Sequence, residues 1–412
     1  MTNVILHSDL NNFYASVECR DRPDLAKVPM AVCGSREKRH GIVLAKNYPA
    51  KAFGIITGEP VWKAVSKCPA LVTVPPRFSL YLEYSEKVRQ IYRRYTDLIE
   101  PFGIDECWLD VTGSRKLFGH GLVIADNIRK RVREELGITV SIGVSYNKIF
   151  AKLGSDMKKP DAVTEITESN FKDIVWPLPV GELLYVGRAT GRKLRNIGIK
   201  TIGDLACMSF SHISDYLGKY GQTLWFFANG RDESVVRKDG CESVIKSIGN
   251  STTTPRDLVC LEDVKAVCYL LADSVAKRLR SHYLKGRTVQ IHIRDVSLVS
   301  ISRQGFLDHY TCSSYDIAEK AIQLFRESWF WHKNIRSLGL KVTDLSEMDD
   351  VIQPSLWGLT RIQKRECIDM SMDLIRERYG YYSVRRALLL KNDLSAIDPE
   401  KEHVIHPLSY FR

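Results

Sequence analysis

The sequence predicts an α+β protein built from several domains, and three observations lead to this fold class. The chain has 412 residues, which is enough for two to four domains at roughly 100–200 residues each. Its first 167 residues alternate short apolar strands with helices around one tight hairpin, a pattern typical of a sheet with helices on its face. The next 70 or so residues (168–236) are helical, and residues 243–345 follow a β-α-β-β-α-β order.

The first part of the chain is expected to form a sheet covered by helices. Its strand-like runs are apolar and bounded by polar residues or glycine, and its helices carry apolar residues at helical spacing. The predicted strands are Asn3–His7, Met30–Cys33, Ile42–Ala45, Ile99–Gly103, Cys107–Val111 and Thr139–Val144. The predicted helices are Asn12–Cys19, Phe78–Leu98 and Ile124–Leu136. A tight turn at residues 104–106 joins two of the strands.

The helical middle contains a helix, a glycine-containing turn and a second helix within Leu183–Leu205. Such a hairpin directs backbone N–H groups at the start of a helix, which is a site for a DNA phosphate. The candidate contacts are Gly187, Arg188 and Gly191, although Ala189 stands where such hairpins usually carry a second glycine. The alternative is two helices that pack through their glycines.

The part beyond residue 242 predicts a small sandwich of one sheet and two helices, after a charged stretch at 231–238 that is typical of a linker. Its predicted elements are, in order, Ser243–Ser251 (strand), Leu261–Tyr283 (helix), Thr288–Arg294 (strand), Leu298–His309 (strand), Tyr315–Trp331 (helix) and Ile335–Val342 (strand). Apolar residues alternate with Gln290, His292 and Arg294, so one face of the sheet is polar and basic. Contact with a phosphate backbone and plain solvation both explain such a face. The predicted DNA contacts in this part are Lys246, Ser247, Arg294, Arg336 and Lys341.

The charge and composition narrow the class of partner. A formal net charge of +11 favours an anionic partner, nucleic acid before a membrane surface, and a merely basic enzyme is the alternative. No apolar run is long enough to span a membrane and no signal peptide is visible, so we expect a cytoplasmic protein without membrane contact. Ten cysteines without a C-x-x-C pair argue against a zinc site and a disulfide framework.

Three carboxylates stand where predicted strands end. Asp9 follows the first strand, and Asp105 and Glu106 lie in the hairpin turn. Because successive side chains of a strand face opposite sides, the last two can serve one site only at a turn or bulge. Together the three would hold two divalent cations roughly 3.5–4 Å apart, and oxygen ligands with a phosphate substrate favour Mg²⁺. The alternatives are a helix cap at Asp9 and a solvated turn at Asp105 and Glu106.

Five motifs, in order along the chain, carry a resemblance to a known family. They are Asp9–Glu18, Asn47–Gly54, Gly103–Asp110, Gly143–Lys148 and Ala151–Pro160. Together they resemble the Y-family translesion DNA polymerases, with features of the DinB and UmuC branches, from residue 3 to about 345. The resemblance implies a right-hand polymerase with a ferredoxin-like palm, small fingers, a helical thumb with a helix-hairpin-helix, and a βαββαβ little finger. The implied boundaries are 1–30 and 78–167 for the palm, 31–77 for the fingers, 168–237 for the thumb, 238–242 for a linker, 243–345 for the little finger and 346–412 for a C-terminal extension.

The resemblance also implies roles for single residues. Asp9, Asp105 and Glu106 become the catalytic carboxylates and, with the carbonyl of Leu10, the ligands of two Mg²⁺ ions, for which Mn²⁺ is expected to substitute. Tyr14 falls at the gate beneath the deoxyribose, where an ordinary core aromatic is the alternative. The residues implied in binding the incoming nucleotide are Asn11, Asn12, Phe13, Tyr14, Ala45, Tyr48, Lys51 and Lys159. Of these, Asn11, Ala45 and Lys51 depart from the family pattern and are expected to weaken the grip on the nucleotide.

The expected function is low-fidelity, template-directed synthesis across damaged DNA by a monomer, with primer–template DNA and dNTP as substrates. Beyond residue 345, Gln353, Leu356 and Trp357 resemble the peptide by which bacterial polymerases hold the sliding clamp, and a plain linker is the alternative. A basic helix is expected near Ile362–Tyr379. Two other functions stay open: a catalytically weak or inactive relative that binds DNA and the clamp, and, more distantly, a palm-type nucleotidyl cyclase.

Overall fold

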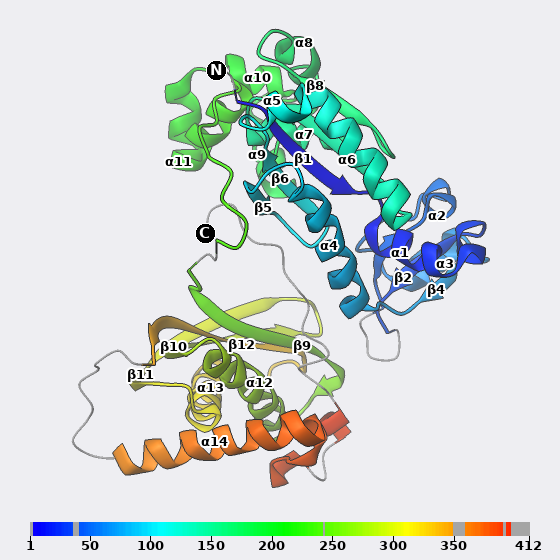
Figure 1. Cartoon of the computed structure of the whole chain (residues 1–412). Coiled ribbons are helices and arrows are strands. Elements are labelled where there is room, and N and C mark those ends of the chain that lie inside the picture. The colour runs from blue at the N-terminus through cyan, green and yellow to red at the C-terminus, as the bar shows by residue number, and fades with distance from the viewer. Residues whose placement is uncertain (1–2, 36–40, 242–243, 349–358, 390–392, 397–412) are drawn as a thin grey trace. The chain divides into compact units, whose positions relative to one another are not determined.

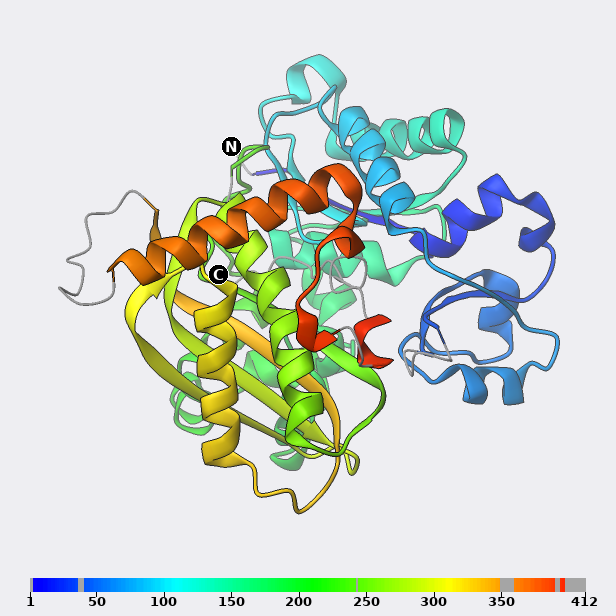
Figure 2. The same ribbon diagram turned by 90° about the horizontal axis from the view of Figure 1, so that it is seen from below.

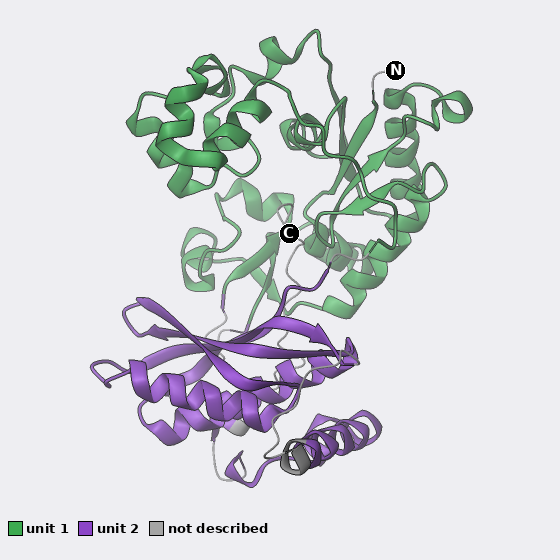
Figure 3. Ribbon diagram, turned by 90° about the vertical axis from the view of Figure 1, so that its left-hand side faces the viewer, with its two compact units in different colours: residues 1–34, 42–242, 406–412 green, residues 35–41, 243–405 purple. Residues whose placement is uncertain are grey.

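The computed structural model describes residues 3–35, 41–241, 244–348, 359–389 and 393–396. Within these ranges, residues up to 34 and from 42 to 241 form one compact unit, and residues from 244 onward form a second (Figure 3). Each unit has its own buried hydrophobic core. In the described part of the chain, no helix is both long enough and apolar enough to cross a membrane.

The first unit is built around a five-stranded sheet with the strand order β5-β6-β1-β7-β8. Its strands are β1 (Ile5–Leu10), β5 (Ile99–Pro101), β6 (Glu106–Asp110), β7 (Val140–Ser145) and β8 (Val163–Ile166). The helices that cover it are α4 (Phe78–Tyr92), α6 (Gly121–Leu136) and α7 (Lys148–Met157) (Figure 1). Every residue of β1 is buried: Leu6 and Leu10 join the core with α4 and α6, while His7 and Asp9 contact α7 on the other face. This second face carries the candidate site.

Two smaller parts complete the first unit. The elements of the first part, whose sheet has the order β3-β2-β4, are α1 (Phe13–Asp21), η1 (Pro23–Ala26), β2 (Met30–Cys33), β3 (Val43–Lys46), α2 (Tyr48–Ala52), α3 (Val61–Lys67) and β4 (Val72–Val74). The helices of the second part are α8 (Phe171–Val175), η2 (Val180–Glu182), α9 (Arg188–Asn196), α10 (Ile202–Cys207) and α11 (Phe210–Ala228), and α5 (Arg115–Phe118) follows β6.

The segment after α11 returns to the five-stranded sheet. Val236 is buried, and the backbone N–H of Arg237 donates to the carboxylate of Glu100 at 2.9 Å. The same carboxylate pairs with Lys148 at 2.6 Å. The stretch 231–238, which the charge pattern predicted as a linker, is therefore attached to the sheet through the contacts of Arg237 with Glu100.

The second unit has a four-stranded antiparallel sheet of order β11-β10-β12-β9, with two helices on one face (Figures 1 and 2). Its elements are β9 (Ser247–Leu258), α12 (Leu261–Ser281), β10 (Leu284–Asp295), β11 (Ser300–Thr311), α13 (Ser314–Ser328) and β12 (Ile335–Glu347). This is the predicted β-α-β-β-α-β order. In β10, Ile291 and Ile293 are buried in the core with the helices, and His292 and Arg294 are exposed. The polar face predicted from the alternation is present.

A C-terminal segment folds against the helices of the second unit. It consists of α14 (Leu359–Tyr379), η3 (Tyr381–Ser383), η4 (Ala387–Leu389) and η5 (Asp393–Ala396). α14 contacts α13, and it lies on the side of the helices that is away from the sheet (Figure 2). Leu389 and Leu394 are buried in the same core as α12 and α13. The segment is therefore part of the second unit.

Some predicted element ends differ from the structure. The helix predicted to reach Leu98 ends at Tyr92, because the hydroxyl of Thr96 donates to the carbonyl of Asp110 in β6 at 2.7 Å and the chain turns there. β9 extends to Leu258, because its serine- and threonine-rich stretch pairs with β12. Neither α7 nor β8 was among the predicted elements. The boundaries predicted for palm, fingers, thumb, linker and little finger stay predictions.

Candidate active site

Three carboxylates, Asp9, Asp105 and Glu106, lie near one another at the end of β1, and we refer to them as the carboxylate site. Asp9 and Glu106 are direct neighbours in the antiparallel pairing of β1 with β6, so their side chains share one face of the sheet. Asp105 lies in the turn just before β6, and its carbonyl accepts the N–H of Leu10 at 3.0 Å. The β5–β6 turn therefore brings the three carboxylates together.

Two lysines neutralise part of this negative charge. The Nζ of Lys152 lies 3.3 Å from Oδ2 of Asp9 and 3.1 Å from Oε1 of Glu106. The Nζ of Lys159 lies 2.9 Å from the same oxygen of Asp9. Both lysines also pair with Asp156 of α7, at 3.0 and 2.9 Å. A single ammonium group therefore already bridges Asp9 and Glu106.

Burial and mutual repulsion shape the ionisation of the site. The pKa of Asp105 is raised to about 7 by burial and by the charges of Glu106 and Asp9. Burial also raises the pKa of Asp9, against the opposing charge of Lys152. Burial acts in the same direction on Glu106, but His7 and Lys152 stabilise its carboxylate and hold its pKa well below the usual range. The site therefore has negative charge that its own lysines do not fully balance.

The donor set fits a divalent cation of the magnesium type. All three side chains offer carboxylate oxygens, the ligands that Mg²⁺ prefers, and the ammonium of Lys152 stands between two of them as a monovalent cation. Among the described residues, no three His, Cys, Asp or Glu side chains converge on a single point in the way a bound ion requires. Two observations therefore indicate that the site fits a divalent cation: all three side chains offer carboxylate oxygens, and the ammonium group of Lys152 lies between two of them.

Tyr14 lies at the edge of the carboxylate site. Its ring stacks on Tyr81 at a centroid distance of 4.4 Å and an interplanar angle of 9°, with Phe78 edge-on at 5.9 Å. Burial raises its pKa to about 12, and the charge of Asp105 contributes, so the hydroxyl is near that carboxylate. Phe13, the preceding residue, is turned into the hydrophobic core. The stacking holds the Tyr14 ring in place beside the carboxylates.

The first turn of α2 also approaches the site. Burial raises the pKa of Tyr48, and the charges of Lys159 and Asp9 act on it in opposite directions, which places its hydroxyl near both. The Nζ of Lys51 lies 5.8 Å from the centre of the Tyr48 ring. Ala45, on β3, packs against the small core between β2 and α1. Tyr48 and Lys159 thus lie close enough for the lysine charge to act on the tyrosine, and their role in binding one nucleotide stays a prediction.

Asn11 differs from its predicted role. Its side chain is buried, its Nδ2 donates to Oγ of Ser141 at 3.0 Å, and its Oδ1 accepts the N–H of Asp161 at 2.9 Å. The amide therefore holds the loop that carries Lys159 against the sheet, which leaves neither end directed at a nucleotide. Asn12 begins α1 in the left-handed conformation, with φ of 47°.

Several residues at this site were not predicted from the sequence, namely His7, Lys152, Ser155 and Asp156. Two local patterns were available: His7 lies two residues before Asp9 and so shares its strand face, and Lys152 and Asp156 are four residues apart on one helix. Both patterns become informative only once α7 is placed over β1.

The predicted DNA contacts divide between the two units. Gly187 caps the start of α9 and Arg188 is its first residue, and both are exposed. Gly191 is buried, and its N–H donates to the carbonyl of Gly187 at 2.8 Å, so the prediction of a phosphate contact at this amide is not supported. In the second unit the exposed candidates are Lys246, Arg294 and Lys341, and the half-buried ones are Ser247 and Arg336. The predicted clamp contacts Gln353, Leu356 and Trp357 lie outside the described residues.

Comparisons with known proteins agree with this arrangement. The impB/mucB/samB family matches residues 8–156, and its C-terminal domain matches residues 245–356. A DNA polymerase-iota thumb domain matches residues 182–232. A DNA polymerase IV from Acetivibrio thermocellus is 58% identical over 393 residues, covering 95% of this chain and 98% of the relative. The chain belongs to the impB/mucB/samB family.

Other relatives and a solved structure support the same assignment. DNA polymerase IV 1 from Bacillus subtilis is 37% identical, covering 96% of this chain and 95% of the relative. DNA polymerase IV from Moorella thermoacetica is 38% identical, covering 94% of this chain and 96% of the relative. A solved Y-family DNA polymerase chimera superposes with a TM-score of 0.74 at 24% identity, covering 83% of this chain and 98% of that one. The predicted right-hand polymerase fold is confirmed.

Proposed function

We propose that this family member is a low-fidelity, template-directed DNA polymerase that copies damaged DNA, transferring a nucleotide from a dNTP to the primer 3′-hydroxyl with two Mg²⁺ ions. The observation that carries the proposal is the pairing of Asp9 with Glu106 across β1 and β6, with Asp105 beside them. The names of the relatives, DNA polymerase IV at up to 58% identity, support the same reaction. Mn²⁺ is expected to replace Mg²⁺.

The carboxylate site, with the carbonyl of Leu10, would hold the cations. Divalent cations held there would supply activation of the attacking hydroxyl and stabilisation of the pyrophosphate leaving group. Lys152 and Lys159 both have Asp156 as a second partner, at 3.0 and 2.9 Å. The two ammonium groups therefore keep a counter-charge when the oxygens of Asp9 are taken by another cation.

The residues around the carboxylates would hold the nucleotide. Lys159 and Lys51 would supply positive charge for the triphosphate as charge moves to the leaving group, and Tyr48 would supply a hydroxyl. Tyr14 places a flat ring beneath the sugar, where a hydrogen at C2′ is tolerated and a hydroxyl is not.

Primer–template DNA would be held through its phosphates, by the exposed start of α9 and by the polar face of the four-stranded sheet. Lys341 stands opposite Gln290 in the strand pairing, on the same face as Arg294. Such contacts give binding that is independent of sequence and falls steeply with salt. We further propose that the protein acts as a monomer in the cytoplasm.

Primer extension by the purified full chain tests this function. We expect extension on an undamaged template and on one that contains an abasic site, in the presence of Mg²⁺ and not of EDTA. A folded protein that binds primer–template DNA and adds no nucleotide would instead indicate a DNA-binding relative without catalytic activity.

A sliding clamp is the further partner in this proposal, on the strength of the peptide Gln-Pro-Ser-Leu-Trp at residues 353–357. Replacing Gln353, Leu356 and Trp357 by alanine should leave synthesis without a clamp unchanged and abolish stimulation by a bacterial clamp, because one amide and two apolar anchors are lost. Persisting stimulation would identify the peptide as a linker.

A further inference from the structure

His7 is fully buried between α7 and the carboxylate site, and no step of the proposed reaction uses it. Its Nδ1 lies 2.8 Å from Oγ of Ser155, and its Nε2 lies 3.5 Å from Oε2 of Glu106. The ring of Trp108 stands edge-on to the imidazole at 5.3 Å. The imidazole therefore connects α7 to one oxygen of Glu106.

The hydrogen bonds of Ser155 determine how the imidazole is oriented. The hydroxyl of Ser155 lies 2.8 Å from Nδ1 of His7 and 2.7 Å from the carbonyl of Lys152, so it holds this edge of the ring against α7. Nε2 is then directed at Oε2 of Glu106. Two lone pairs facing each other would repel, so one proton lies between these atoms. A neutral imidazole has one N–H, so with Glu106 ionised Nε2 carries that proton and donates it, and Nδ1 accepts from the hydroxyl of Ser155.

The two oxygens of Glu106 thereby have different surroundings. Oε1 lies 3.1 Å from the ammonium of Lys152, which also contacts Asp9 at 3.3 Å, so this oxygen is turned to the place where a cation is held. Oε2 of Glu106 and Nε2 of His7 are both buried, and neither has a hydrogen-bond partner of normal geometry among the described residues; the two atoms lie 3.5 Å apart. Each of these two atoms is thus left to the other.

We propose that His7 is a positioning residue that holds Glu106 with Oε1 turned toward the cation site, and that Ser155 holds His7 in that orientation. This role of His7 rests on one part of the proposed function, namely that Glu106 is a ligand of a cation. Groups that hydrogen-bond to a metal ligand typically change metal affinity by roughly 10–100-fold when they are removed.

Two substitutions of His7 separate positioning from packing. In His7→Gln the amide nitrogen reaches the place of Nε2 and still donates to Glu106, whereas in His7→Asn it reaches only the place of Nδ1. Both remove the imidazole and its contact with Trp108. We expect His7→Asn to weaken Mn²⁺ binding by about 10–100-fold and His7→Gln by less than about threefold.

The measurement is Mn²⁺ affinity by electron paramagnetic resonance, on the full chain bound to dideoxy-terminated primer–template DNA and dNTP, so that no turnover is required. Equal melting temperatures of the two variants are the control for folding. Unchanged affinity in both variants, or an equal loss in both, would overturn the proposal. Ser155→Ala is a mild helix substitution that serves if the His7 variants do not fold: a loss of Mn²⁺ affinity supports the proposal, and wild-type affinity overturns it.

A failure of the proposed function can be distinguished from a failure of the proposed role of His7. In that case the wild-type chain itself would bind no Mn²⁺ at Glu106, so Glu106→Gln would have wild-type Mn²⁺ affinity. If Glu106→Gln loses the ion and His7→Asn keeps it, only the role of His7 is wrong.

Discussion

Two of the carboxylate clusters in the described part of the chain differ in the kind of basic side chain that they contact. In the carboxylate site the partners are lysines, which are compact point charges that other cations can replace. In the second group, which we call the α14 cluster, the partners are arginines, whose planar groups donate several hydrogen bonds in a fixed geometry. The α14 cluster consists of Asp273, Arg280, Ser314, Asp369, Asp373, Arg376 and Arg386.

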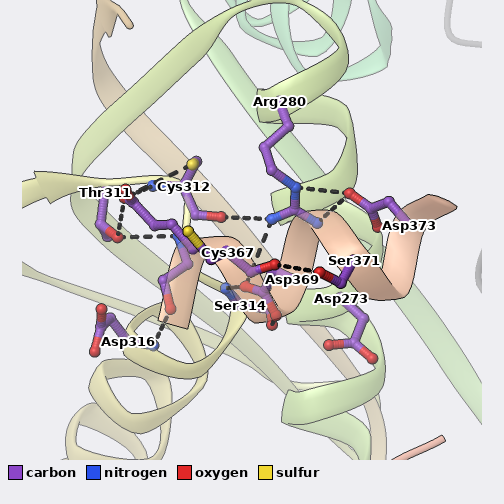
Figure 4. Close-up of polar contacts among 12 residues, drawn as sticks. Asp273, Arg280, Thr311, Cys312, Ser314, Asp316, Cys367, Asp369, Ser371 and Asp373 are labelled. Carbon is purple, nitrogen blue, oxygen red and sulfur yellow. Dashed lines mark hydrogen bonds and ion pairs between the residues drawn. The ribbon is translucent and has the colours of Figure 1, made fainter. Parts of the chain in front are cut away.

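The α14 cluster joins α14 to the helices of the second unit (Figure 4). Arg280 at the end of α12 donates to Asp373 at 2.7 Å. Both oxygens of Asp369 accept from Ser314, one from its N–H at 2.6 Å and one from its hydroxyl at 2.7 Å, at the first turn of α13. These bonds attach one face of α14 to the start of one helix and the end of another.

Asp273, in the middle of α12, shows the contrast with the carboxylate site most clearly. Its Oδ2 accepts from Arg376 at 3.0 Å and its Oδ1 accepts from Arg386 at 3.2 Å, so both oxygens are bonded. Asp105 of the carboxylate site has no ion pair among the described residues, and its pKa is raised to about 7. The comparison teaches that carboxylates saturated by arginine serve structure, while carboxylates left with excess charge are available for chemistry.

The largest expected effect is a loss of stability when the α14 cluster is disrupted. Asp273→Asn removes the charge that Arg376 and Arg386 share, and leaving buried charges unpaired typically destabilises a protein by about 3–5 kcal/mol. Urea unfolding should show the loss in the transition of the second unit. The matched control is Asp215→Asn, an exposed carboxylate on α11. Equal unfolding of the two variants would contradict the structural role of the α14 cluster.

The next prediction concerns the carboxylate site and tests the role of Tyr14, whose ring lies at its edge. As a gate, Tyr14→Ala should raise ribonucleotide use by orders of magnitude and lower deoxynucleotide use only modestly, because the ring no longer blocks a 2′-hydroxyl. As a core residue, its truncation should cost about 3–5 kcal/mol of stability and depress both reactions together. The measurement is the ratio of kcat/KM for dCTP and CTP opposite template G. A ratio equal to that of the wild type would defeat the gate assignment.

A smaller effect is expected for Asp105→Asn. The pKa of Asp105 is raised to about 7 from 3.8, so the folded state binds its proton more tightly than the unfolded state does. This group therefore favours the folded state below pH 4, and its contribution is lost as the pH rises toward 7. Asparagine carries no charge, so the variant should melt about 2–4 °C higher than the wild type at pH 8, if about 1 kcal/mol is recovered. Thermal melts of both proteins at pH 8 without divalent cations measure the difference in melting temperature. A lower melting temperature for the variant would contradict the conclusion that the carboxylate site has unbalanced negative charge.

How far the sequence predicts this molecule depends on how local each feature is. Asp9 at the end of a strand and Glu106 in a turn follow from local patterns, and the structure places them opposite each other in the pairing of β1 with β6. The contact of His7 with Ser155 joins residues 148 apart in the chain, and no local pattern encodes it. The docking of α14 was missed for another reason: hydrophobic periodicity predicts faces that pack through apolar side chains, and this face packs through aspartate and arginine.

The most direct test of the account is single-nucleotide incorporation by Glu106→Ala, measured with primer–template affinity on the same preparation. Incorporation should fall by more than the roughly 10–100-fold typical of residues that only support a metal ligand. Affinity for primer–template DNA should stay at the wild-type value, because phosphate contacts elsewhere dominate binding. Near-normal incorporation by the folded variant would contradict the assignment of the carboxylate site as the catalytic centre.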